Sequence, residues 1–290
     1  MRGCCLATVR HDSSYRGTFY GLGPSGDNDG YTGKNGDMIH LADGFWNVRG
    51  DFRIAYVLNV GTHMSLIRRP EGGFILLDSY EPNKDDHAEI MALTDNGSTI
   101  EAVLNVHPFH TVHCEFMQRL LPNARHIGTR RHHQQLPDLR WDPALIEDTA
   151  TQQQFADTLD FSIPSGVDFI SDNSNVHVGS VLVRHRTSGI VHSDDTINVL
   201  DLPSLVEKVL PGPKLRFHPK LGDALEKRAG AADDYIRWAN DLAGDWADTQ
   251  IVCAAHNGIG RMAEQSFGDA IAGALDHASG ILDAHRKKHG

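Results

Sequence analysis

Three histidines at regular three-residue spacing directly follow an apolar, strand-like run, and this feature constrains the fold of the chain most. The run is IEAVLNV, and the stretch after it, HPFHTVHCE, contains His107, His110 and His113. Polar residues clustered where a strand ends are typical of a rigid scaffold that presents site residues on a loop. Three imidazoles are too few to hold a metal ion alone, so the stretch predicts further ligands elsewhere in the chain.

The composition limits the class of protein. The chain has 290 residues, 40% of them hydrophobic and 22% charged, which fits a soluble globular protein. Its formal net charge of -11 argues against a nucleic-acid partner, because an acidic surface repels phosphate backbones. No window approaches about 18 consecutive apolar residues, and residues 1–20 contain no apolar targeting segment. We therefore expect a cytoplasmic protein with no membrane association, and its four cysteines show no disulfide or CxxC pattern.

The residue pattern divides the chain into an extension and one large domain. Residues 1–44 are predicted to be an irregular N-terminal extension, because the chain from residue 11 is rich in Gly, Asp, Asn and Ser without apolar periodicity. Its GLGPSG stretch matches a dinucleotide-binding pattern only formally, since Pro24 interrupts it and more turn residues follow. Residues 45–290 predict a layered α/β domain, because strand-like runs alternate with helical stretches at roughly 84–94, 222–243 and 264–287.

A predicted β-hairpin between residues 176 and 199 supplies two further candidate ligands. With its turn centred on residues 186–189, residues whose numbers sum to about 375 oppose each other. His177 at the start of the first strand and Asp195 at the end of the second then meet at the open end of the hairpin. Both are metal-ligand types, although a surface pair is the alternative. His256 follows the apolar run IVCAA at a Gly-rich turn, where a buried core histidine is the alternative.

The order of these features resembles the metallo-β-lactamase superfamily, whose hallmark T-H-x-H-x-D-H is followed by separate His, Asp and His ligands. The stretch SLIRRPEGGFILLDSY resembles the paired strands before the hallmark, and NVHVGSV, VHSDDTI and AAHNGIG resemble the segments that carry the later ligands. The resemblance spans roughly residues 45–260 and implies a four-layer αββα sandwich with metals at one edge. It implies catalytic roles for Asp195, in the bridging position, and for His256. The implied metal ligands are His107, His110, His113, His177, Asp195 and His256.

The hallmark departs from the family pattern at two places. Pro108 stands where the first ligand is expected, so His107 reaches a metal only if the loop bulges. Val112 replaces the hallmark Asp, which in the family binds the second metal and orients the attacking hydroxide. Because two adjacent cations repel each other, they need anionic ligands. The sequence therefore predicts one tightly held metal and a weaker second position.

Other polar residues lie near the candidate ligands in sequence. His192 precedes Asp195 by three on the same strand, so alternation puts it on the opposite face and predicts a structural role. Asp194 is either a carboxylate that orients an imidazole or a solvated turn residue. His63 is a substrate-positioning residue in the family comparison or, more simply, a polar loop residue. Surface positions are expected for His132 and His133.

Imidazoles and a carboxylate suit zinc first, with iron or manganese as alternatives, in one or two ions. A metal with an open coordination position can lower the pKa of its bound water to about 7, which makes hydroxide available for attack on a carbonyl. The resemblance thus implies a metal-dependent hydrolase using metal-bound hydroxide on an ester, thioester, lactone or related acyl bond of a small molecule. A non-hydrolytic iron or redox protein of the same fold and a non-catalytic metal-binding domain stay open, as does a homo-oligomeric state.

Overall fold

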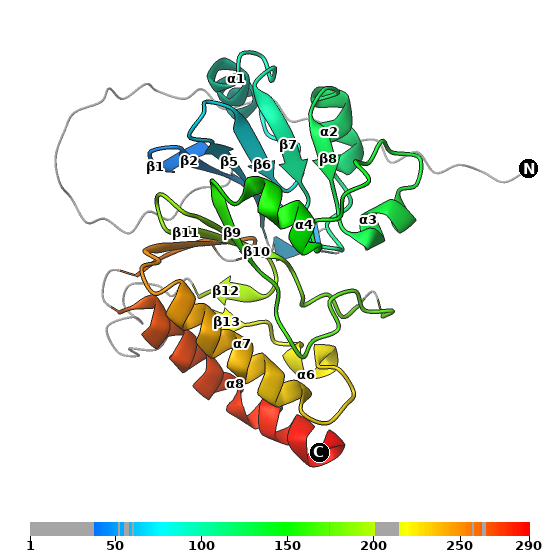
Figure 1. Cartoon of the computed structure of the whole chain (residues 1–290), viewed down its shortest axis with the longest axis vertical. Helices are drawn as coiled ribbons and strands as arrows, with labels where there is room; N and C mark the ends of the chain where they lie inside the picture. Colours follow the sequence, from blue (N-terminus) through cyan, green and yellow to red (C-terminus); the bar gives the residue numbers. More distant parts are fainter. Residues whose placement is uncertain are drawn as a thin grey trace, which may run out of the picture. The chain divides into compact units, whose positions relative to one another are not determined.

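The computed structural model describes residues 38–290, apart from 52, 55–57, 60, 174, 201–214, 257 and 263–264 (Figure 1). The GLGPSG stretch and most of the predicted extension lie outside the described residues. Strand β1 (Met38–Ala42) begins inside the segment that was expected to be irregular up to residue 44. It pairs antiparallel with the next strand through a tight turn at Gly44, whose φ of 75° suits glycine.

Two large sheets make up the centre of the domain. The first has the order β1-β2-β5-β6-β7-β8 and the second the order β15-β14-β11-β10-β9. The further strands of the first sheet are β2 (Phe45–Gly50), β5 (Thr62–Arg68), β6 (Phe74–Leu77), β7 (Ile100–Leu104) and β8 (Arg125–Ile127). The second sheet contains β9 (Leu159–Ser162), β10 (Leu182–His185), β11 (Ile190–Ser193), β14 (Ile251–Ala254) and β15 (Gly258–Arg261). Two small ribbons pair β3 (Arg53–Ile54) with β4 (Leu58–Asn59), and β12 (Ile197–Val199) with β13 (Leu215–Phe217).

Helices cover the outer faces of both sheets (Figure 1). Those on the side of the first sheet are α1 (Lys84–Leu93), α2 (Cys114–Leu120) and α3 (Arg130–Gln135). Those on the side of the second are α7 (Ala231–Asp245) and α8 (Phe267–His289). Shorter helices are α4 (Thr149–Gln152), the 3-10 helix η1 (Gln153–Phe155) and α6 (Leu221–Ala224). None of the helices in the described part of the chain is both long and apolar enough to cross a membrane.

The predicted helix over 222–243 is wrong in its first half. Only α6 forms there, and α7 begins after Gly230, whose left-handed backbone (φ 77°) separates the two helices. Arg228, between them, forms ion pairs with Glu226 and Asp234 instead of continuing a helix. The charged run before Gly230 therefore makes a turn rather than a helical face.

The apolar core lies in three layers, as a four-layer αββα sandwich requires. Phe45 and Ile67 contribute to the cluster between the two sheets, whereas their chain neighbours Trp46 and Leu66 contribute to the cluster under α1 and α2. This alternation follows from the period of two in a strand. A third cluster lies between the second sheet and the pair α7–α8. The predicted αββα fold is confirmed.

The hairpin between residues 176 and 199 has the predicted register. Val183 lies opposite His192 and Arg184 opposite Val191. Strand β11 of this hairpin also pairs in parallel with β14. His177 lies in irregular chain before β10 rather than at the start of a strand, so the regular part of the hairpin is shorter than predicted.

Candidate metal centre

The candidate site residues gather at one edge of the sandwich because several of them follow parallel strands. Strands β6, β7 and β8 run parallel in the first sheet, and β11 and β14 run parallel in the second. The carboxyl ends of parallel strands meet at the same edge of a sheet, where polar side chains are presented on short loops. The residues placed within three positions of such a strand end are Asp78, His107, Asp194, Asp195 and His256.

Asp195 is the centre of a histidine cluster. Its carboxylate lies 2.8 Å from His256 Nε2, 3.1 Å from His107 Nε2 and 3.8 Å from His177 Nε2. The ring of His110 stacks on that of His107 with the centroids 4.0 Å apart. Ligand atoms of His107, His110 and Asp195 all lie within 4.8 Å of one another. The structure thus brings together five of the six predicted ligands.

The cluster fits a cation. Asp195 is only 1% exposed, and its ion-pair partners among the described residues are histidines, with no Lys or Arg. Neither of its oxygens, nor the buried His107 Nε2, has a well-aligned hydrogen-bond partner in the described part of the chain. A buried carboxylate without such a partner is costly, and imidazole nitrogens with a carboxylate form a typical zinc donor set.

The protonation states also suit a cation. Burial lowers the pKa of His110 to about 3, and His107 contributes to the shift. Burial acts to raise the pKa of Asp195, but its histidine neighbours, His107 first, hold it well below its ordinary value. At neutral pH the carboxyl is therefore ionised and His110 is neutral, which are the forms that bind metals.

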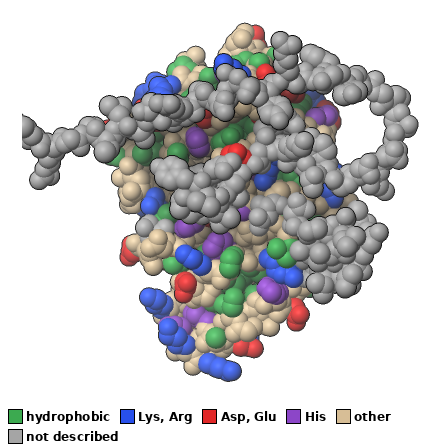
Figure 2. All heavy atoms as spheres, turned by 180° about the vertical axis from the view of Figure 1, so that it is seen from behind, with side chains coloured by type: hydrophobic (Ala, Val, Ile, Leu, Met, Phe, Trp, Pro, Cys, Tyr) green, Lys and Arg blue, Asp and Glu red, His purple; other side chains and the backbone are tan. Residues whose placement is uncertain are grey.

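The outer side of the cluster reaches solvent. The side chains of His110, His177 and His256 are 26%, 38% and 22% exposed, whereas that of His107 is fully buried. Figure 2 shows histidine side chains at several points on one face of the molecule, including its middle part. Solvent can therefore reach the cluster from the side of these three histidines.

The structure places His113 away from the cluster. It is the N-cap residue just before helix α2, and its ring packs edge-on against that of Tyr80, with the ring centroids 5.2 Å apart. Val112 beside it is 69% exposed. The resemblance matched His110 and His113 to two hallmark histidines that bind metal. In the structure, the path of the loop brings His107 rather than His113 next to His110. Phe109 N–H donates to His107 Nδ1 at 3.1 Å, which fixes the His107 ring with Nε2 toward Asp195.

A second, inner group of polar residues lies between the sheets beside the cluster. His192 Nε2 lies 3.1 Å from Asp78 Oδ2, and its Nδ1 lies 2.9 Å from Ser65 Oγ. His63 stacks on His192 with the ring centroids 4.0 Å apart and 9° between the planes. Burial raises the pKa of Asp194 well above its ordinary value, and the nearby Asp78 adds to this. The structural role predicted for His192 agrees with these contacts.

Two predictions about single histidines are wrong. His63 was expected in a polar loop, but it lies in β5 and is 2% exposed. His132 is fully buried, and its Nε2 lies 3.3 Å from the His110 carbonyl oxygen, so it supports the backbone of the cluster. A capping box with Thr129, the residue before α3, turns His132 inward. The alternation of β5 could have indicated the burial of His63, but no comparable signal marks His132.

A cavity of about 360 Å³ lies next to the cluster, and sequence reasoning did not find it. His256 is one of its lining residues, and His218, whose ring is 6.2 Å from that of His177, is another. Other walls come from β13, α6 and α8. The apolar lining residues are Leu200, Phe217, Pro219, Leu221, Ala278 and Ile281.

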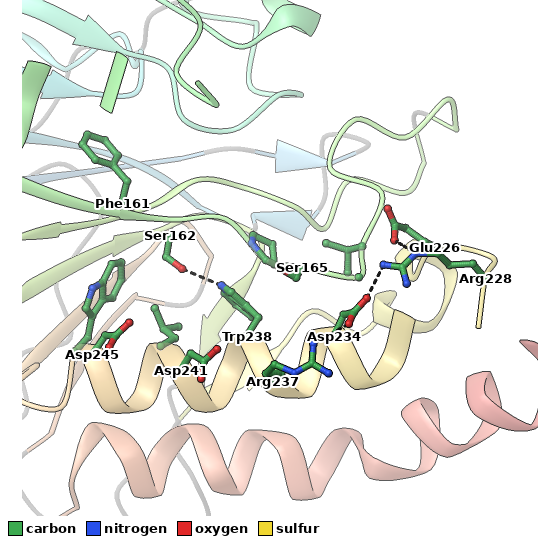
Figure 3. A pocket seen from close by; sticks show the side chains of 15 residues that line it. Phe161, Ser162, Ser165, Glu226, Arg228, Asp234, Arg237, Trp238, Asp241 and Asp245 are labelled. Carbon is green, nitrogen blue, oxygen red and sulfur yellow. Dashed lines mark hydrogen bonds and ion pairs between the residues drawn. The ribbon is translucent and has the colours of Figure 1, made fainter. Parts of the chain in front are cut away.

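A larger cavity of about 550 Å³ lies elsewhere, along α7 (Figure 3). Its lining includes none of the cluster residues. Arg228 is paired with Glu226 and Asp234, and Trp238 Nε1 donates to Ser162 Oγ at 2.8 Å. The figure shows these groups paired with one another rather than converging on an open centre. The Asp195 cluster is therefore the better candidate site, although this cavity is larger.

Solved structures of metallo-β-lactamases have a similar fold. The enzyme from Erythrobacter litoralis matches with a TM-score of 0.55 at 16% identity, covering 84% of this chain and 96% of that one. The enzyme from Hirschia baltica matches with a TM-score of 0.53 at 15% identity, covering 86% and 98%. FIM-1 from Pseudomonas aeruginosa, in its mono-zinc form, matches with a TM-score of 0.53 at 12% identity, covering 86% and 97%. No family model and no curated protein matches the sequence.

Proposed function

Because this chain has the metallo-β-lactamase fold, we propose that it is a metal-dependent hydrolase acting on an ester, thioester, lactone or related acyl bond of a small molecule. One observation carries the proposal. The buried carboxylate of Asp195 has the Nε2 atoms of His107, His177 and His256 within 3.8 Å and no cationic Lys or Arg partner among the described residues. This donor set at the edge of the sandwich favours a divalent cation, zinc first.

The residues of the cluster have distinct roles in this proposal. Asp195 and His107 are the buried ligands that fix the position of the cation, while His110, His177 and His256 border the solvent side. A zinc ion bound there can polarise a carbonyl and lower the pKa of water to about 7. His256 also lines the 360 Å³ cavity, so it lies between the ion and the space for a substrate. We place the apolar part of the substrate against Phe217, Leu221 and their neighbours, where water is excluded.

The proposal is tested by metal analysis and a hydrolysis panel on the same preparation. The protein, purified without added metal or chelator, is expected to retain zinc, iron or manganese. It is also expected to cleave at least one activated ester, thioester, lactone or β-lactam. Dialysis against a chelator abolishes this activity and the same metal restores it, because the cation supplies the chemistry. Retained metal without turnover of any acyl substrate contradicts the hydrolase. A bound iron with a redox signal points to the non-hydrolytic alternative.

A further inference from the structure

Asp194, next to the proposed metal ligand Asp195, is a buried carboxylate without a charge partner of its own. It is 0% exposed, and neither of its oxygens accepts a well-aligned hydrogen bond within the described ranges. Its ionisable contacts include His63 Nε2 at 3.4 Å and His110 Nδ1 at 3.6 Å, both to Oδ1, and the carboxyl of Asp78. Burying a charge in this way is unfavourable unless a cation or a proton compensates it.

A second carboxylate increases this need. Ligand atoms of Asp78, His110 and Asp194 lie within 4.8 Å of one another. Each oxygen of the Asp78 carboxylate has a polar partner. Val106 N–H donates to Oδ1 at 2.9 Å, and His192 Nε2 lies 3.1 Å from Oδ2. Two carboxylates this close repel each other, because Coulomb energy is large where solvent screening is weak. A compensating charge, either a proton or a cation, is therefore needed on the Asp194 side.

His63 and His192 do not supply that charge as metal ligands. Asn47 Nδ2 donates to His63 Nδ1 at 3.1 Å, so the neutral ring carries its proton on Nε2 and presents an N–H toward Asp194. Both nitrogens of His192 have partners already. These histidines support the carboxylates from within the sandwich.

We propose that Asp194, His110 and Asp78 form a second binding position for a divalent cation beside the Asp195 cluster, with Asp194 supplying the carboxylate that Val112 does not. The inference rests on the proposed function, because the two positions share His110. Two carboxylates and one imidazole suit zinc or manganese. A chain with this site holds two cations rather than the one tight and one weak cation that Val112 predicts.

Metal content tests the site. Protein incubated with zinc or manganese alone is passed through gel filtration in metal-free buffer, and bound metal is measured. The wild type is expected to keep two equivalents and Asp194→Asn one. The control is Asp160→Asn, which removes a half-buried carboxylate on β9 that pairs with Arg184 of β10, and it is expected to keep two equivalents. One equivalent in the wild type, or equal content in the wild type and Asp194→Asn, overturns the inference.

Thermal unfolding distinguishes a ligand from a merely structural side chain. In chelator, Asp194→Asn is expected to melt no lower than the wild type, because asparagine has the shape of the Asp194 side chain and needs no compensating charge beside Asp78. With zinc or manganese added, the wild type gains more in Tm than the variant, because the wild type binds one more ion. An Asp194→Asn variant that melts lower by the same amount in both conditions overturns the inference. Neither measurement uses a substrate, so loss of the hydrolase proposal leaves this test intact.

Discussion

Asp195→Ala is expected to abolish tight metal binding at the histidine cluster and to lower hydrolysis by at least about 100-fold, since removing even an outer partner of a metal ligand typically costs 10–100-fold. The reason is geometric. Asp195 is the residue that His107, His177 and His256 all face, at 2.8 to 3.8 Å. Without its carboxylate the three imidazoles surround a neutral space, and both the charge and the shared contact are lost.

Metal content and hydrolysis rate are measured on the same samples of the wild type, Asp195→Ala and the control Asp160→Ala. The control carboxylate contacts Arg184 and Arg186 and is remote from the cluster in its contacts, so the control is expected to match the wild type in both readings. Unchanged metal content in Asp195→Ala would show that Asp195 is not a ligand. Lost metal with retained hydrolysis would show that the reaction does not use this site.

Gly166→Ala is expected to destabilise the fold by about 2–5 kcal/mol, from a left-handed backbone and a steric clash together. Gly166 has a φ of 76°, a region that alanine adopts only at a cost. A Cβ there would lie 2.1 Å from the Ala231 carbonyl oxygen, and this oxygen belongs to the first turn of α7 and cannot move freely. Equilibrium unfolding in denaturant measures the effect.

Gly280→Ala is the matched control. Gly280 lies within α8, and a Cβ added there meets nothing within 4 Å. Alanine is the better helix former, so this variant is expected to gain about 0.5–1 kcal/mol. If Gly166→Ala were as stable as the wild type, the close approach of residues 164–167 to α7 would be wrong.

The order of strands and ligands could be predicted because it depends on local pattern. Runs of alternating apolar residues gave the strands, and the turn at 186–189 gave the register that opposes Val183 and His192. The position of the turn fixes the register of a β-hairpin. Which residues lie opposite each other can therefore be found by counting outward from the turn. The presence of Asp195 and His256 at strand ends followed in the same way.

The inner residues could not be predicted because their contacts are not local. Asp78 and His192 meet across 114 residues, and Ser65 meets His192 across 127. The alternation of β5 could indicate that His63 is buried, but nothing near His63 along the chain shows that its partner is His192 of β11. The place of His113 outside the cluster was missed for a different reason, since it depends on the path of a short loop, which residue spacing alone does not define.

Each sheet is local in sequence, and this has a consequence for the order of folding events. All strands of the first sheet come from residues before 128, and all strands of the second from residues after 158. Each half can pair its strands without the other half, although β11 and β14 must first be brought together across the long connection between Ser193 and Ile251. The contacts that join the halves link residues far apart in the sequence, such as Arg49 Nη1 donating to the Ala254 carbonyl oxygen at 2.7 Å. During refolding, backbone structure is therefore expected to return before cation affinity, and the interval between the two signals measures how long the halves take to dock.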